Sequence, residues 1–405
     1  MTVYSPSRVD LLVVTRHYSP EPTGSAPPMQ EIAEWFAAKG KAVRVVTVRP
    51  NYPGSHIFDG YEDGQHDNKL EAGVLVRRLP TTPVRGSAMM SRLGPELTFL
   101  IRLAAARISG AERPCPAVIS LCPSILTVLG TIPLRARGGR HVAVVHDIQS
   151  GLGSALGDGF TRALMPILRW LERWTLNQVD TVIVLSEEMR RHLRALGVLS
   201  PIEVQPPTVN TQFIRPLPEP VGPFTLMYSG NLGRKQGLGQ VLDLAQELHR
   251  RKAGVQIIIR GSGAMRDALV REAAEIGLTN LRIEDLVPRE QIPVSLAEAH
   301  LHLVPQIASG GDFAVPSKIY SIMSAGRTFV ATAARGSTLA TLAQQTGAFI
   351  CSSPQNVGEF ADNVELLARS PELRQRMASA GRQYIENYAD TSVVMTSFSE
   401  ILFSR

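Results

Sequence analysis

The feature that most constrains the fold is a regular alternation of short apolar runs and longer amphipathic stretches along almost all of the 405 residues. The apolar runs are rich in Val, Ile and Leu, which is typical of strands buried on both faces. The stretches between them, such as residues 29–39 and 162–178, place apolar residues at helical spacing. Strands that alternate with helices form βαβ units, so the sequence predicts an α/β fold with doubly wound parallel sheets.

The length and the prolines divide this series into two domains. A chain of 405 residues exceeds what one ordinary core supports, and six prolines between residues 206 and 223 exclude a helix or a central strand there. We therefore expect a first domain over residues 1–205, a linker over 206–223 and a second domain over 224–389. The expected strands are residues 9–15, 42–48, 74–79, 117–121, 141–146 and 181–185, then 224–228, 255–260, 281–284, 301–304 and 328–332. Three helical patterns, residues 355–369, 372–387 and 392–403, end the chain.

Cysteine content and the apolar segments bear on the compartment. Three cysteines cannot form a disulfide framework for a chain of this size, which favours a reducing compartment. No apolar segment precedes the first strand, so no secretory signal is expected. Prolines interrupt the longest uncharged run, residues 115–134, which we interpret as a buried strand followed by a helix rather than as a membrane span.

The loop after the first strand of the second domain is the strongest functional signal. Open α/β sheets bind ligands at the carboxyl ends of their strands, so we expect the chemistry in a cleft between the domains. In this loop Gly230 and Gly233 precede Arg234 and Lys235, which stand at the start of a helix. Glycines let the backbone approach a ligand, and two cations beside a helix N-terminus suit a diphosphate. A Walker A loop is excluded because no G-K-[ST] follows.

Two further loops of the second domain are candidate ligand contacts. A tight turn with little side-chain bulk, suited to a nucleobase edge, follows the next strand at Arg260, Gly261, Ser262 and Gly263. Pro316, Ser317 and Lys318 open a later helix and present free N–H groups and a cation. An ordinary capped helix would show the same pattern.

In the first domain, His146 and Asp147 follow a strand and are candidates for hydrogen bonding or proton transfer; a histidine that only satisfies loop backbone is the alternative. Gly24 lies in the loop before the first helix, whose N-terminus could receive an anion, although the loop lacks G-x-G-x-x-G and could be purely structural. His300 and His302 share a strand face without a third ligand, and no D-x-D occurs. We expect no metal and no other cofactor.

Together these loops resemble those of family 4 glycosyltransferases of the GT-B fold, which are retaining enzymes with a nucleotide-sugar donor. The resemblance covers essentially the whole chain and is closest to the colanic acid and O-antigen exopolysaccharide enzymes. Four motifs carry it: S-P-E-P-T-G at residues 19–24, H-D-I-Q at 146–149, S-G-N-L-G-R-K-Q-G at 229–237, and V-P-S-K with S-A-G-R at 315–327.

The resemblance implies a role for each loop. Gly24 would lie near the β-phosphate and the acceptor, His146 near the donor sugar, and residues 260–263 beside the base. Arg234 and Lys235 would hold the diphosphate, together with Gly230, Ser317 and Lys318. Residues 390–405 would pack back onto the first domain. Many members carry paired glutamates where Phe313 and Ser321 stand here, so the family's usual ribose and sugar contacts are not expected at those positions.

The basic residues concentrate in the first half of the chain. Residues 1–200 hold 23 basic against 17 acidic side chains, and residues 77–140 hold ten arginines against two glutamates. Between residues 85 and 107 the arginines mix with apolar residues, a pattern that suits an anionic membrane surface; a solvated helix face is the alternative. The residues expected to face the membrane are Met89, Met90, Arg92 and Leu93. Nucleic acid is disfavoured because Phe99 is the single aromatic residue among these arginines.

The sequence therefore predicts a retaining glycosyltransferase, cytoplasmic and peripheral to the inner membrane. It would move a sugar from a nucleotide-diphosphate sugar to a glycan or lipid-linked acceptor in exopolysaccharide or O-antigen synthesis. A nucleotide-sugar epimerase of similar build and a non-catalytic nucleotide-sugar-binding protein are the alternatives. Neither needs a second substrate.

Overall fold

The computed structural model describes residues 9–22, 24–52, 54, 56–82, 89–122, 124–148, 159–307 and 315–404, without the side chains of residues 89–93, 159–164 and 235. The chain forms two compact units. The first unit contains residues 1–205 and 395–405, and the second contains residues 206–394.

The first unit is built on a mostly parallel sheet with the strand order β3-β4-β2-β1-β5-β6-β7-β8. Its strands are β1 (Leu11–Val14), β2 (Val43–Val48), β3 (Asn68–Glu71), β4 (Val74–Leu79), β5 (Cys115–Cys122), β6 (Arg135–Val145), β7 (Thr181–Val184) and β8 (Ile202–Val204). All four residues of β1 are buried, as expected for a central strand covered on both faces. Among the described strands, β3 alone pairs antiparallel, against β4.

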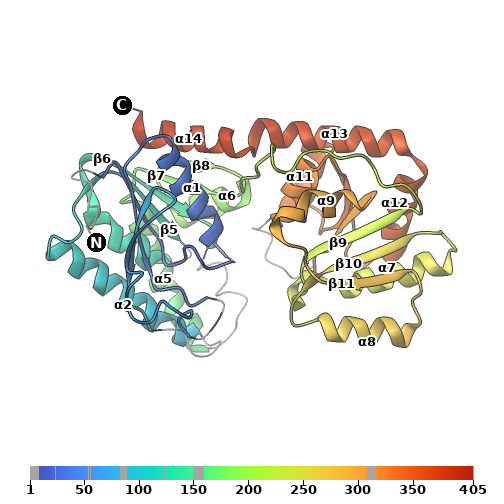
Figure 1. The fold of residues 1–405 in the computed structure, drawn as a ribbon, viewed down its shortest axis with the longest axis horizontal. Helices are drawn as coiled ribbons and strands as arrows, with labels where there is room; N and C mark the ends of the chain where they lie inside the picture. Colours follow the sequence, from blue (N-terminus) through green and yellow to red (C-terminus); the bar gives the residue numbers. More distant parts are fainter. Residues whose placement is uncertain are drawn as a thin grey trace. The chain divides into compact units, whose positions relative to one another are not determined.

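Helices cover both faces of this sheet (Figure 1). They are α1 (Ala26–Ala38), α2 (Met89–Ile108), α3 (Ile125–Thr131), α5 (Gly159–Leu176) and α6 (Glu187–Leu196). Figure 1 shows α1 and the end of α14 (Thr391–Phe403) on one face, and α2 and α5 on the other. The rings of Phe36 and Phe403 lie 5.7 Å apart, and Gln205 donates to Ser397 at 2.7 Å. The last helix therefore ends on the first unit.

The second unit contains a fully parallel sheet with the strand order β11-β10-β9-β12-β13-β14. Its strands are β9 (Thr225–Asn231), β10 (Gln256–Ser262), β11 (Leu281–Glu284), β12 (Leu301–Val304), β13 (Phe329–Thr332) and β14 (Ile350–Ser352). Its helices are α7 (Gly239–Arg250), α8 (Arg266–Ile276), α9 (Ile292–Ala297), α10 (Lys318–Ser324), α11 (Thr338–Thr346), α12 (Val357–Arg369) and α13 (Pro371–Tyr388). Two separate cores, one around Tyr228 and Phe360 and one around Phe329 and Ile385, lie in this unit.

The proline-rich segment, which the sequence predicts as a linker, packs on the second unit. Residues 210–223 form no helix or strand, but Val209 and Ile214 are buried in the core around Phe329. Arginine side chains supply the donors for its carbonyl groups: Arg382 donates to the carbonyl of Ile214 at 2.9 Å, and Arg327 donates to that of Pro218 at 2.8 Å. Prolines lack N–H groups for a ladder, so side-chain donors hold this segment instead.

Among the described residues, no helix combines the length and the apolar character needed to cross a bilayer.

Candidate functional site

The glycine loops of the second unit lie in backbone contact with each other. A Cβ on Gly261 would stand 2.2 Å from the carbonyl oxygen of Gly230, and one on Gly263 would stand 2.7 Å from that of Leu232. The amide of Leu232 donates to the carbonyl of Ser262 at 2.9 Å. Glycine is therefore required at both positions by the close approach of the loops after β9 and β10. Ser262 and Gly263 are the exposed residues of this turn, while Gly261 is buried.

Lys318 reaches the same glycine loop from the start of α10. Its Nζ lies 3.7 Å from the centroid of the Tyr228 ring, and a Cβ on Gly230 would stand 3.0 Å from it. The Tyr228 hydroxyl donates to the carbonyl of Asn231 at 2.6 Å and so fixes the ring. Burial lowers the pKa of Lys318 to about 7. Among the described residues the ammonium group has no carboxylate partner, so it is available to an anion.

Arg234 lies in a short 3₁₀ turn, Arg234–Gln236, between β9 and α7. Its side chain is exposed and forms no ion pair with the described residues. Gly237 follows with a φ of 66° and lies against the backbone of Gln306, which closes the loop onto the end of β12. The side chain of Lys235 lies outside the described residues. Ser317 is exposed directly before Lys318.

Arg260 is held inside the second unit. Its guanidinium donates to Glu284 at 2.5 Å, to Glu298 at 2.7 Å and to Ser295 at 2.5 Å, and its side chain is buried. A guanidinium with two carboxylate partners is a structural centre joining β10, β11 and α9. The side-chain donors of Arg260 are therefore used within the second unit, and a contact of residues 260–263 with a nucleobase, expected through backbone groups, stays a prediction. The sequence showed a cation after a strand but not the two glutamates that neutralise it.

In the first unit, His146 and Gly24 come together at the carboxyl edge of the sheet. The ring of His146 approaches the hydroxyl of Ser25 with its Nδ1 at 3.0 Å, and Ser25 directly follows Gly24. Burial lowers the pKa of His146 to about 4, so the imidazole is neutral near pH 7. Asp147 is exposed beside it. A neutral imidazole here can hydrogen-bond a sugar hydroxyl without adding charge.

The same edge is organised by Glu21, His17 and Tyr52, three residues that the sequence pattern did not indicate as site residues. The buried carboxylate of Glu21 accepts from the backbone amides of Asn51 and Tyr52 at 2.9 Å each, and from His17 Nδ1 at 2.7 Å. The rings of His17 and Tyr52 lie 5.2 Å apart in an edge-to-face arrangement. Since a carboxylate only accepts, Nδ1 carries the hydrogen and Nε2 is the remaining ring nitrogen. The signal for this group was the glutamate in S-P-E-P-T-G.

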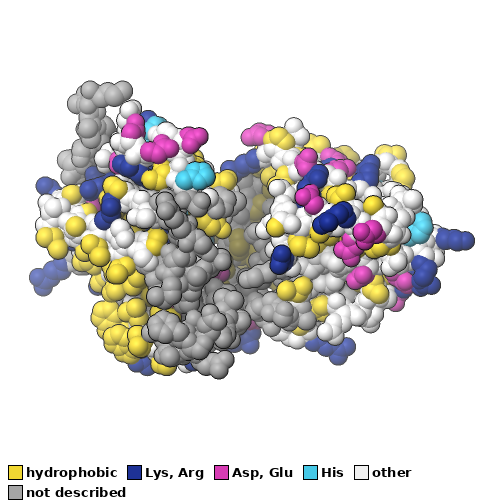
Figure 2. All heavy atoms as spheres, turned by 90° about the horizontal axis from the view of Figure 1, so that it is seen from below, with side chains coloured by type: hydrophobic (Ala, Val, Ile, Leu, Met, Phe, Trp, Pro, Cys, Tyr) yellow, Lys and Arg dark blue, Asp and Glu magenta, His cyan; other side chains and the backbone are white. Residues whose placement is uncertain are grey.

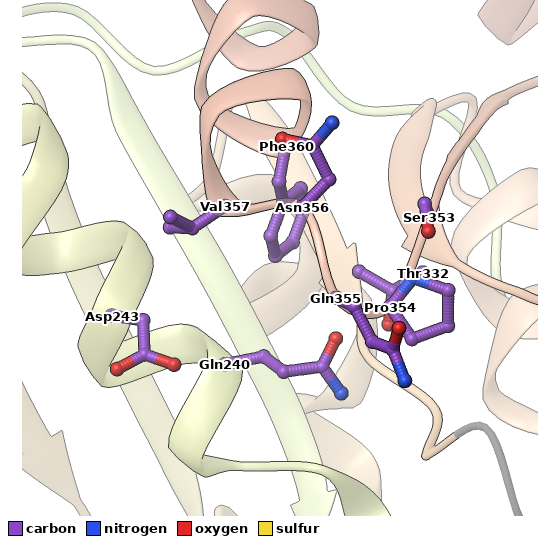
Figure 3. Close-up of a pocket in the computed structure, with 9 residues that line it drawn as sticks. All are labelled: Gln240, Asp243, Thr332, Ser353, Pro354, Gln355, Asn356, Val357 and Phe360. Atoms are coloured by element: carbon purple, nitrogen blue, oxygen red, sulfur yellow. The ribbon is translucent and has the colours of Figure 1, made fainter.

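A small cavity of about 160 Å³ lies in the second unit, and its described lining includes none of the predicted site residues. Figure 3 shows its lining, with Gln240 and Asp243 from α7 and Asn356, Val357 and Phe360 from the start of α12. Gln240 donates to the carbonyl of Gln306 at 2.9 Å and so touches the loop that Gly237 closes. The cavity is a neighbour of the glycine loop rather than part of it.

The two candidate metal histidines satisfy backbone groups. His300 Nδ1 accepts from the amide of Thr225 at 3.1 Å, and the ring of the buried His302 lies 3.0 Å from the carbonyl of Leu296. Within the described part of the chain, no three His, Cys, Asp or Glu side chains are grouped to hold a metal ion.

Several predicted positions lie outside the described residues. They are the side chains of Met89, Met90, Arg92 and Leu93, and the residue Phe313. Ser321 lies in α10 and is half-buried.

Comparisons with known proteins assign both units to described families. Residues 23–208 match a family described as "Glycosyl transferase 4-like domain", and residues 209–384 match "Glycosyl transferases group 1". The chain is 26% identical over 407 residues to "Putative colanic acid biosynthesis glycosyl transferase WcaI" of Escherichia coli (strain K12), covering 96% of this chain and 98% of that protein.

Two solved structures are similar across nearly the full chain. Sucrose-phosphate synthase of Thermosynechococcus elongatus aligns with a TM-score of 0.74 at 15% identity, over 97% of this chain and 98% of that one. HepE of Anabaena, solved in complex with UDP and glucose, aligns with a TM-score of 0.68 at 13% identity, over 98% and 100%. These likenesses show the GT-B fold.

Proposed function

We propose a reaction for this chain, which belongs to the glycosyltransferases that join a glycosyl transferase 4-like domain to a glycosyl transferases group 1 domain. The chain is therefore a transferase. It transfers a sugar, with retention, from a nucleotide-diphosphate sugar to a glycan or lipid-linked acceptor in exopolysaccharide or O-antigen synthesis. The relative named for colanic acid biosynthesis supports this role. Because the Anabaena structure holds UDP and glucose, a UDP-sugar is the first donor to test.

The geometry of Lys318 is the observation that supports the donor assignment best. It is a half-buried cation that has no carboxylate partner among the described residues. It lies against a glycine loop whose backbone an anion can approach closely. Arg234 adds an exposed guanidinium after the same strand, without an ion-pair partner in the part of the chain that the structure describes. Cations and free N–H groups stabilise the charge that develops on a departing diphosphate.

In this mechanism the acceptor hydroxyl attacks the anomeric carbon on the face from which the nucleotide diphosphate departs. The glycosidic C–O bond to phosphate breaks, and the hydroxyl proton passes to the leaving phosphate oxygen. Arg234, Lys235 and Lys318 neutralise the leaving group, so no metal is required. His146, as a neutral imidazole, positions the donor sugar, and Asp147 lies beside it. Transfer should therefore persist in the presence of a chelator.

On the acceptor side we assign the exposed ring of Tyr52 and Nε2 of His17. Tyr52 offers an aromatic face with a 44% exposed side chain, and His17 offers a ring nitrogen held in place by Glu21. An aromatic face suits the C–H face of a sugar ring, and the nitrogen suits its hydroxyl.

The decisive experiment incubates the protein with a panel of nucleotide sugars and lipid-diphosphate acceptors and scores acceptor-linked sugar. We expect Arg234→Ala with Lys235→Ala to lower kcat by about 100-fold with the fold intact. The matched control is Arg271→Ala, an exposed cation on α8, which should keep the wild-type rate. A near-normal rate for the double variant would contradict the proposal that Arg234 and Lys235 bind the donor diphosphate. Free nucleotide diphosphate without any acceptor-linked product would favour an epimerase instead, and donor binding without turnover a binding protein.

A further inference from the structure

The outer surface of the α2/α5 layer of the first unit carries an unusual concentration of exposed apolar side chains. On α2, Leu97, Ile101 and Ile108 are 51%, 60% and 86% exposed. On α5, Ile167, Trp170 and Trp174 are 60%, 54% and 42% exposed. Figure 2, which looks at the molecule from the side of α2 and α5 in Figure 1, shows hydrophobic side chains gathered on this part of the first unit. We call these six residues the apolar face.

Helical periodicity makes the apolar face continuous along each helix. Ile101 and Ile108 follow Leu97 by four and eleven residues, a spacing that places all three on one side of α2. Trp170 and Trp174 are one turn apart on α5, and their rings stack with centroids 6.3 Å apart. Both helices pack against α3, so they belong to the same layer over the sheet.

The charges around the apolar face are of one sign. Arg102 flanks it on α2, and the exposed Arg169 and Arg173 flank it on α5. None of the three forms an ion pair with the described residues. The glutamates of these helices point inward: Glu172 is buried, and the half-buried Glu96 accepts from Ser124 at 2.8 Å. The outer surface described for these helices is therefore apolar, aromatic and cationic, without an acidic group.

From this combination we infer that the apolar face of α2 and α5 docks onto an anionic membrane surface, with Trp170 and Trp174 entering the interface. Tryptophan is the residue most suited to the boundary between headgroups and acyl chains, and arginines beside it complement anionic headgroups. A second copy of this chain fits the surface less well. A two-fold contact would bring this surface, with Arg102, Arg169 and Arg173 around it, against an identical cationic surface of the partner, and like charges repel.

The inference rests on the proposed function in one respect, because a lipid-linked acceptor would be presented at such a surface. The inference extends the membrane contact expected for the basic α2 segment to α5, a helix for which the sequence suggested no role. Vesicle binding needs no sugar transfer, so failure of the docking surface and failure of the transferase reaction can be told apart.

The test measures co-sedimentation with vesicles of phosphatidylcholine containing about 30% phosphatidylglycerol, at about 50 mM and about 300 mM salt. Wild type should bind at low salt and lose most binding at high salt. Trp170→Gln with Trp174→Gln should lower the partition coefficient about tenfold or more. Leu286→Gln with Val294→Gln, two exposed apolar residues of the second unit, is the matched control and should bind as wild type.

A second measurement locates the tryptophans directly. The chain has three tryptophans, so Trp35→Phe leaves only Trp170 and Trp174 to fluoresce. We expect brominated lipids to quench this variant. Arg102→Gln with Arg169→Gln should weaken binding to anionic vesicles and lower its salt dependence, even if the tryptophan variant folds poorly.

Three results would overturn the inference. These are no binding by wild type at low salt, equal binding by the tryptophan double variant, or absence of quenching. A concentration-dependent dimer that the same variant abolishes would assign the surface to a second copy instead.

Discussion

Lys318 illustrates how a functional cation can lower the stability of its own fold. The sequence placed a lysine at a helix start, but nothing in the local pattern indicated that its ammonium group is buried against Tyr228. That contact joins residues ninety positions apart and depends on the pairing of β9 with β12. When burial lowers the pKa of a lysine, the unfolded chain binds the proton more tightly than the folded protein does. Protonation of that lysine therefore favours the unfolded state.

We predict that Lys318→Met stabilises the protein and weakens nucleotide binding. The folded pKa is about 7 and the unfolded value is the ordinary lysine pKa, so the unfolded state binds more protons between these values. The lysine therefore costs stability fully below about pH 7, and the cost disappears as the pH approaches about 10. In urea unfolding the variant should gain on the order of 1–3 kcal/mol at pH 6, and the gain should shrink towards pH 10.

The same variant should bind UDP about tenfold more weakly in calorimetry, because a charge-assisted contact is lost. Lys252→Met, at an exposed lysine of the second unit, should change neither quantity. A variant that binds UDP normally and is less stable at every pH would show that Lys318 is a structural cation.

The loops after β1 and β2 depend on a single buried carboxylate. Glu21 satisfies two backbone amides of the second loop and orients the histidine of the first. We predict that Glu21→Ala lowers the free energy of unfolding by on the order of 2–4 kcal/mol, because it leaves buried donors without partners. Urea unfolding measures this loss, and Glu62→Ala, at an exposed glutamate in the loop after β2, should be neutral within about 0.5 kcal/mol.

Glu21→Gln separates the structural role from the acceptor role. The amide oxygen can still accept from both backbone amides, but its NH₂ group faces His17 Nδ1 and favours the opposite tautomer. We expect a small loss of stability and a rise of about fivefold or more in acceptor KM, with the KM for the donor unchanged. Equal rises in both KM values would contradict an acceptor-side role for His17.

At the scale of helices and strands, the sequence predicts the buried strands better than the short or exposed ones. Eleven strands were predictable because their Val- and Ile-rich runs record burial on both faces of a parallel sheet. The strands β3, β8 and β14 were missed since each has three or four residues, and β3 is largely exposed at an antiparallel edge. The proline segment was correctly expected to lack helix and strand, but its docking on the second unit depends on Arg327, Arg374 and Arg382, which lie far along the chain.

The candidate site was predictable to the same degree. Glycine loops after strands are visible in sequence, since only glycine allows the approach of Gly261 to the carbonyl of Gly230. The partners of charged residues are not visible, because they come from other strands and helices. For this reason the sequence did not show that the guanidinium of Arg260 is neutralised by Glu284 and Glu298. For the same reason the Glu21 group was overlooked.

The chain passes from the second unit into the first within one helix. Helix α14 begins at Thr391 in the second unit and ends at Phe403 in the first, so the core of the first unit includes residues from both ends of the chain. Leu402 and Phe398 are buried, and the ring of Phe403 lies 4.5 Å from Lys41 Nζ. The first unit therefore cannot complete its core from residues 1–205 alone.

We predict that Leu402→Ala destabilises the first unit selectively. Truncating a buried leucine costs on the order of 2–4 kcal/mol, and the separate cores of the two units confine the loss to one of them. Hydrogen exchange should accelerate in α1, on the face where α14 ends, and remain unchanged in α7 and β10. The control is Val393→Ala, at a 40% exposed residue of the same helix within the second unit. Uniform acceleration in both units would mean that they unfold as one cooperative body, because a loss in one core would then be felt equally in the other.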